Sequence, residues 1–70
     1  MNKMILRFKG YDDWSRPVYE AEGRLYVDVA PLKNRHPDIC TKSDNDFWGE
    51  PDSTVSNVEL EFIPFRVTWD

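Results

Sequence analysis

Apolar and polar residues alternate along much of this chain, and the first ten residues show the alternation clearly. Met4, Leu6 and Phe8 share one parity and alternate with Ile5, Arg7 and Lys9 on the other. A period of two is typical of a β-strand, because successive side chains of a strand point to opposite faces. We therefore expect a first strand here that turns one face toward the core.

The segment 17–29 has the pattern of a β-hairpin. Two short extended runs, 18–21 and 24–29, are separated by the pair Glu22-Gly23. Glycine tolerates the positive φ that tight hairpin turns require, so this pair is a good candidate for the turn. We expect two antiparallel strands joined at this point.

The middle of the chain is richer in turn formers than in alternation. Residues 31–38 form a basic loop that contains two prolines, and residues 39–42 have the composition of a short strand. Residues 43–56 are polar, and a single helical turn can begin at Ser43 or Asp44. No amphipathic helix of useful length fits this segment.

The C-terminal segment alternates most regularly. Apolar residues occupy even positions over 58–62 and odd positions over 65–69, with Pro64 between the two runs. A change of parity requires a bend or a bulge, and proline removes one ladder donor. We expect one domain over residues 1–70, in which 58–70 is a C-terminal strand pair bent at the proline. The partner of this strand is either the N-terminal strand or a second copy of the chain.

These elements together predict an all-β fold, a small antiparallel β-roll or barrel of four to six short strands with long loops and at most one short helical turn. The chain has 70 residues, one Cys and one His. Neither an internal disulfide nor a structural zinc site of four Cys/His ligands can therefore stabilise so small a core. Self-association is the remaining way to bury more surface, so we expect a homo-oligomer.

The sequence has no run close to the roughly 20 apolar residues that a membrane-spanning helix needs. Near the N-terminus, Lys3, Arg7 and Lys9 interrupt the apolar residues, so we do not expect a signal peptide. A lone cysteine, Cys40, fits a reducing compartment. We therefore expect a protein of the cytoplasm that has no membrane partner.

The net charge of −4 is unevenly distributed, because residues 1–42 carry +2 and residues 43–70 carry −6. An acidic half disfavours unaided binding along a nucleic-acid backbone, which needs a basic stripe. It permits docking on a basic protein surface, although a charge that merely keeps the protein in solution is the plainer interpretation. The acidic residues that we expect at a protein interface are Asp44, Asp46, Glu50 and Asp52.

Few residues have the arrangement that catalysis or metal binding requires. The segment from Asp44 begins like a calcium loop, but Trp48 and Val55 stand where oxygen ligands belong. His36 and Cys40 flank a helix-breaking proline, and a small buried thiol is the simpler interpretation of the cysteine. No phosphate-binding glycine loop or nucleophile elbow occurs. We expect no enzymatic activity, no metal and no cofactor.

Aromatic and basic residues in the loops are the better candidates for function. Trp, Tyr and Arg anchor interfaces, and aromatic faces stack on nucleobases. A Trp plate with basic side chains as phosphate partners would hold a nucleotide. Alternatively, the two loop Trp residues close the ends of the barrel, which we expect of one of them while the role of the other stays open. The candidate ligand-binding residues are Tyr11, Trp14, Arg16, Arg35, Lys42 and Trp48.

Four blocks of the sequence carry a resemblance to a known family: FKGYDDWSRPVY (8–19), GRLYVDV (23–29), PDICTK (37–42) and FWGEPD (47–52). In this order they resemble the large polyvalent protein-associated domain of type 28, over about residues 7–54. Such domains occur in phages, plasmids and conjugative elements of gut Firmicutes. The resemblance implies a mobile-element protein that acts inside a bacterial host, and it brings no activity and no catalytic residue to this chain.

Small stand-alone phage proteins of this kind often act in counter-defence, and this analogy completes the expectation. The expected function is that of a non-enzymatic binding protein, which blocks a host defence protein such as a nuclease or sequesters a small nucleotide immune signal. The alternative is a structural or accessory module of a mobile-element complex with no small ligand.

Overall fold

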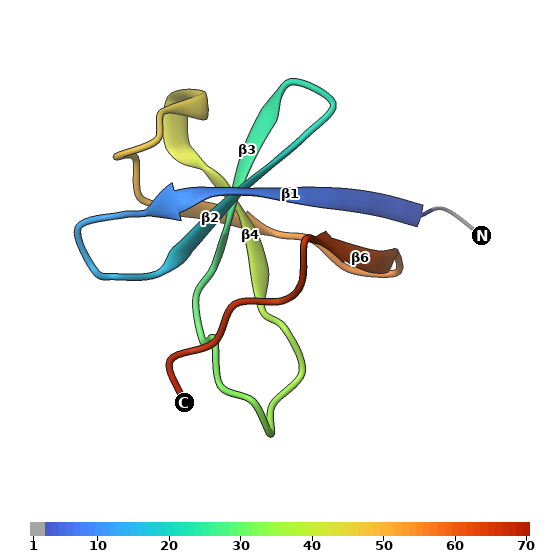
Figure 1. The fold of residues 1–70 in the computed structure, drawn as a ribbon. Helices are drawn as coiled ribbons and strands as arrows, with labels where there is room; N and C mark the ends of the chain where they lie inside the picture. Colours follow the sequence, from blue (N-terminus) through green and yellow to red (C-terminus); the bar gives the residue numbers. More distant parts are fainter. Residues whose placement is uncertain (1–2) are drawn as a thin grey trace.

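The computed structural model describes residues 3–70 and shows one six-stranded sheet with a single turn of 3-10 helix in this range (Figure 1). The strands lie side by side in the order β5-β4-β3-β2-β1-β6. The all-β fold predicted from the alternation is confirmed, and the sheet curls without closing into a barrel. The elements are β1 (Lys3–Tyr11), β2 (Pro17–Ala21), β3 (Arg24–Asp28), β4 (Ile39–Lys42), η1 (Ser43–Asn45), β5 (Pro51–Thr54) and β6 (Glu59–Ile63).

The C-terminal strand finds its partner within the chain. β6 pairs with β1 in parallel, from Lys3 opposite Glu59 to Arg7 opposite Ile63. The other four strand pairs are antiparallel, and the predicted β2–β3 hairpin turns at Glu22-Gly23. Of the two partners considered for this strand, the N-terminal strand of the same chain is the one observed.

The sheet has to curl because of the short connection between its two edge strands. β5 and β6 lie at opposite edges of the sheet, yet only residues 55–58 join them. The edges of a flat six-stranded sheet lie about 24 Å apart. Five Cα–Cα steps span at most about 18 Å. The two edge strands therefore approach each other around the core.

The core occupies both faces of the sheet. On the concave side Tyr19 is fully buried and packs edge-to-face against Phe62, with ring centroids 5.1 Å apart. On the other side Phe47, from the segment after η1, covers Val27 and Cys40. The first cluster comprises Leu6, Tyr19, Ala21, Tyr26 and Ile39, packed against Met4, Phe8, Val55, Leu60 and Phe62.

Residues 64–70 do not form the predicted second C-terminal strand. The Val67 N–H donates to the Tyr19 hydroxyl at 3.2 Å, and the Trp69 N–H donates to the Pro31 carbonyl at 2.8 Å. These N–H groups donate to isolated acceptors on the body of the protein, and Pro64 has no N–H to donate, so the segment forms no ladder with a neighbouring strand. The prediction of a strand pair bent at the proline is therefore wrong. Trp69, expected on an apolar strand face, is 53% exposed.

One strand escaped prediction. β5 has the sequence Pro-Asp-Ser-Thr and lies at an edge with mostly exposed side chains, so it shows no apolar alternation. The residues directly before and after β5 hold it in place. The Glu50 carbonyl accepts from the Ser43 N–H, and the Val55 N–H donates to the Ile39 carbonyl. Among residues 3–70 there is no helix with the length and hydropathy that a membrane-spanning segment requires.

Candidate functional site

Two segments far apart in the sequence meet around one buried lysine. Lys42, at the end of β4, donates from Nζ to Asp12 Oδ2 at 3.0 Å and to the Gly49 carbonyl at 2.9 Å. Asp12 begins the β1–β2 loop, and Gly49 belongs to the turn between η1 and β5. The ammonium therefore ties these two connections together at one end of the sheet. Because Lys42 is 1% exposed, its prediction as a ligand-binding residue is wrong.

Asp12 organises the β1–β2 loop. Its Oδ1 accepts hydrogen bonds from the backbone N–H groups of Trp14 and Arg16, both at 2.9 Å. Its Oδ2 accepts from Arg16 Nε at 3.0 Å. Ser15 lies within this turn and takes a positive φ of 59°. The loop is therefore a fixed turn that points the indole of Trp14 into solvent, where it is 73% exposed.

Asp12 stays ionised despite its burial. Burial raises the pKa of its carboxyl, but the hydrogen bonds from the Arg16 backbone, the Lys42 ammonium, the Arg16 side chain and the Trp14 backbone lower it more. The pKa of Asp12 consequently lies below its ordinary value. Asp12 therefore pairs with two cations, Arg16 and Lys42, and holds the site together.

The second segment presents Trp48 by a similar device. Asp46 Oδ1 accepts from the Trp48 N–H at 3.2 Å, and the Gly49 N–H donates to the Asp46 carbonyl at 2.9 Å. Phe47 is partly buried on the sheet beside Gly10 and packs edge-to-face on Trp48, with the ring centroids 4.7 Å apart. Phe47 therefore anchors the turn on the sheet, whereas the next residue, Trp48, is 59% exposed to solvent.

A pocket of about 140 Å³ lies between the two segments. Trp14 and Trp48 both line it, and Arg16, which lies 5.7 Å from the Trp14 ring centroid, forms part of the wall. The expectation that one loop Trp closes the end of the barrel is wrong, since both indoles are exposed at this pocket. The full lining is Asp12, Asp13, Trp14, Arg16, Trp48, Gly49 and Glu50.

The predicted basic ligand residues come together only in part, because Arg16 and Lys42 share Asp12 as their partner and Arg35 does not. Arg16 is in the pocket wall, but its guanidinium is bound to Asp12 through Nε and a terminal nitrogen. Arg35 lies on the loop between β3 and β4, where its carbonyl accepts from Arg66. Tyr11 ends β1, is 53% exposed and contacts Phe8 edge-to-face. The sequence grouped these residues by type, whereas the fold gives each a different neighbourhood.

The predicted acidic interface residues also divide. Glu50 lines the pocket, and Asp46 shapes its rim through the Trp48 N–H. Asp44, at a positive φ of 57° in η1, and Asp52, on β5, are exposed without lining it. Asp13, which is not among the predicted site residues, lines the pocket as well. We call Trp14, Trp48, Asp13 and Glu50 the two-tryptophan surface.

The cysteine and histidine lie in different environments. Cys40 is buried in β4, with Sγ 3.8 Å from Thr54 Oγ1, as expected of a small core thiol. His36 is exposed on the β3–β4 loop. In the described part of the chain no group of three or more His, Cys, Asp or Glu residues is placed to hold a metal ion.

Comparisons with known proteins give no relative, because no family model, no curated protein and no solved structure matches the chain. The resemblance to the type 28 domain therefore stays a prediction.

Proposed function

We propose that this protein is a non-enzymatic binding protein that docks the two-tryptophan surface on a basic region of a partner protein. The observation that carries the proposal is the pair of indoles, Trp14 and Trp48, that border one pocket while remaining largely exposed. Trp is strongly enriched among interface hot spots, since one ring buries a large area. Both indoles lie on hydrogen-bonded turns, so little conformational entropy is lost when a partner covers them.

Charge sets the expected chemistry of the partner. Asp13 and Glu50 are exposed in the pocket lining, and neither forms an ion pair within 4.0 Å among residues 3–70. The neighbouring cations, Arg16 and Lys42, are already paired with Asp12. The unpaired charge around the indoles is therefore negative, which favours a partner with Arg or Lys side chains at the contact.

Sequestration of a nucleotide is the weaker of the two modes. Binding sites for small molecules usually enclose roughly 300–1,000 Å³. The pocket here has about 140 Å³. A nucleotide also needs cations for its phosphates, yet Lys42 is buried and Arg16 is bound to a carboxylate. The site fits a single side chain of a partner better than it fits a nucleotide.

The resemblance to a mobile-element domain suggests in which cell the partner is found and what it does there. We propose that the partner is a host defence protein of the bacterial cytoplasm, and that its basic, nucleic-acid-binding surface is blocked. A protein encoded by the mobile element itself would be the partner under the alternative function, that of an accessory module.

The test is affinity capture from a bacterial host lysate with three forms of the tagged protein: the wild type, the double variant Trp14→Ala/Trp48→Ala, and Phe65→Ala. The last is a matched control, because Phe65 is an exposed aromatic residue, 67% accessible, that does not line the pocket. We expect a basic host protein to bind the wild type and the control, to be lost with the double variant, and to elute as salt rises to about 1 M.

Three outcomes would redirect the proposal. A partner that the double variant retains would contradict the assigned surface. Recovery of element-encoded proteins alone would favour the accessory module. A rise in melting temperature with any member of a nucleotide panel would favour sequestration, because a ligand of the native state stabilises it.

A further inference from the structure

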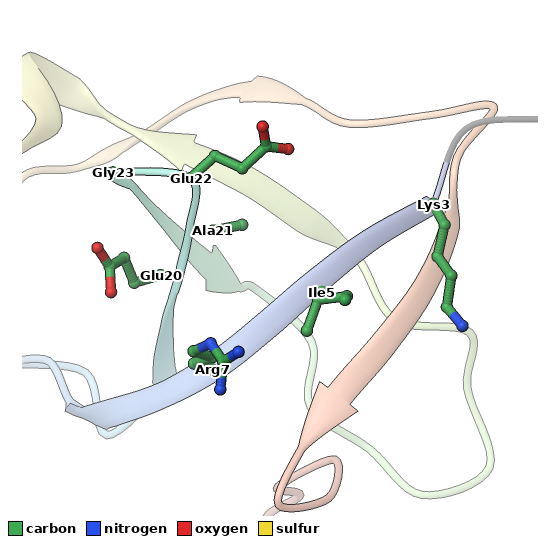
Figure 2. Close-up of a pocket in the computed structure, with 7 residues that line it drawn as sticks. All are labelled: Lys3, Ile5, Arg7, Glu20, Ala21, Glu22 and Gly23. Atoms are coloured by element: carbon green, nitrogen blue, oxygen red, sulfur yellow. The ribbon is translucent and has the colours of Figure 1, made fainter.

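A second hollow, of about 420 Å³, lies along the exposed face of β1, away from the two tryptophans (Figure 2). Figure 2 shows Lys3, Ile5 and Arg7 projecting from β1, and the β2–β3 turn lying across from them. The lining residues are Lys3, Ile5, Arg7, Glu20, Ala21, Glu22 and Gly23. We call this hollow the β1 groove.

The groove lies where the pairing of β1 with β2 stops. β1 meets β2 only from Arg7 onward, opposite Glu20, whereas its residues 3–7 all pair with β6. Residues 3–5 therefore have a strand on one side only. Consecutive strand residues direct their N–H and C=O groups alternately to two sides. At least one residue among 3–5 thus turns both groups toward the groove, where the described residues provide no ladder partner.

The side chains of the groove leave one charge of each sign unpaired. Lys3 is bound to Glu61 at 2.6 Å, and Glu20 to Lys9 at 3.4 Å. Within residues 3–70, neither Arg7 nor Glu22 forms an ion pair at 4.0 Å or less.

An apolar contact lies beside these two free charges. Ile5, next to Arg7 on the exposed face of β1, is 41% exposed. The groove therefore combines open backbone groups, one apolar contact and two free charges of opposite sign.

We propose that the β1 groove binds an extended peptide segment of a partner protein, which adds a short strand beside residues 3–5. Strand addition of this kind takes its affinity from main-chain hydrogen bonds and its specificity from alternate side chains. An acidic side chain of the peptide pairs with Arg7, a basic one with Glu22, and an apolar one covers Ile5. The two glutamates balance Lys3 and Arg7 in the lining, so the groove has no net positive charge to attract a nucleic acid.

The probe is the blocked heptapeptide Thr-Glu-Thr-Val-Thr-Lys-Thr, in which an acidic, an apolar and a basic residue share one face of a strand. It is titrated into the ¹⁵N-labelled protein, and amide signals are followed by NMR. We expect saturable shifts at residues 3–5 and at Gly23. Arg7→Glu should weaken binding several-fold, and Arg24→Glu, an exposed arginine outside the groove, should not.

Two further peptides separate backbone pairing from charge alone. One is N-methylated at the Thr residues and the other at the Glu, Val and Lys residues. Because alternate N–H groups face the neighbouring strand, one of them should bind at least about tenfold more weakly than the parent and the other nearly as well. No shift at millimolar peptide, or equal loss with both methylated peptides, would overturn the proposal. Shifts at residues 3–5 that follow protein concentration without peptide would assign the groove to a second copy and also overturn it.

Discussion

The ammonium of Lys42 lies 3.0 Å from the carboxylate of Asp12, and both side chains are almost completely buried. The same ammonium holds the Gly49 carbonyl at 2.9 Å. One lysine thereby fixes the two turns that carry Trp14 and Trp48. The cation that the sequence offers as a phosphate partner serves instead as the scaffold of a surface whose exposed charge is negative.

Removal of this lysine should destabilise the protein strongly. Lys42→Met leaves a buried carboxylate with Arg16 as its remaining cation, and breaking a buried ion pair from one side costs about 3–5 kcal/mol. Urea unfolding followed by circular dichroism measures the loss. The matched control is Lys3→Met, at an exposed pair with Glu61, which should cost less than about 1 kcal/mol. Equal effects of the two substitutions would contradict a buried structural role for Lys42.

The lowered pKa of Asp12 predicts a loss of stability in acid. The native carboxyl resists protonation, so its contribution to stability is present above the unfolded pKa of about 3.9. This contribution is lost as the pH falls through the lower native pKa. The free energy of unfolding should therefore fall between about pH 5 and pH 2, and it should fall less steeply in Asp12→Asn. Parallel pH profiles for the two proteins would show that this carboxyl does not carry the effect.

The turn at Trp48 has no room for a side chain at Gly49. A Cβ there would overlap the Ser43 carbonyl oxygen and lie 3.1 Å from the Asp46 carbonyl oxygen, both of them backbone atoms. Gly49→Ala should cost about 1–3 kcal/mol, as overpacking usually does, and should weaken binding at the two-tryptophan surface. Thermal unfolding and the capture assay measure the two effects. An unchanged melting temperature would mean that the turn differs from the one described.

The C-terminal tail should detach when Arg66 is lost. Arg66 donates to the carbonyls of Leu32 and Arg35 at 2.9 and 2.8 Å, and its Nε lies 3.6 Å from the buried Asp28. In Arg66→Met we expect faster amide hydrogen exchange at Trp69 and little change at core amides of β2, because the sheet does not include the tail. Uniformly faster exchange would instead make the tail part of the cooperative core.

The sequence predicts those elements in which alternation and burial agree. The strand through Leu6 follows from its alternation, because only one of its faces is buried, and the hairpin follows from the turn at Gly23 between two extended runs. β5 has no apolar face and could not be found in this way. In the tail, alternation predicted a strand that does not form. Val67 and Trp69 alternate like strand residues, but their N–H groups bind isolated acceptors.

The sequence predicted which residue types occur in the candidate site, but not which of them contact each other. The exposed loop tryptophans, Trp14 and Trp48, were among the predicted residues, and the pocket brings them together. The roles of Lys42 and Asp12 could not be read from the chain, because they are 30 residues apart and meet only when β4 lies in place. A buried ion pair of this kind depends on tertiary distance, which the pattern of a single strand does not contain.

The most direct measurement follows the three indole N–H signals by NMR as the captured partner is added. Trp69 is the comparison indole, because it does not line the pocket. We expect the signals of Trp14 and Trp48 to shift or broaden on binding, while that of Trp69 changes least. A partner that binds with the Trp14 and Trp48 signals unmoved would contradict the two-tryptophan surface as the binding site.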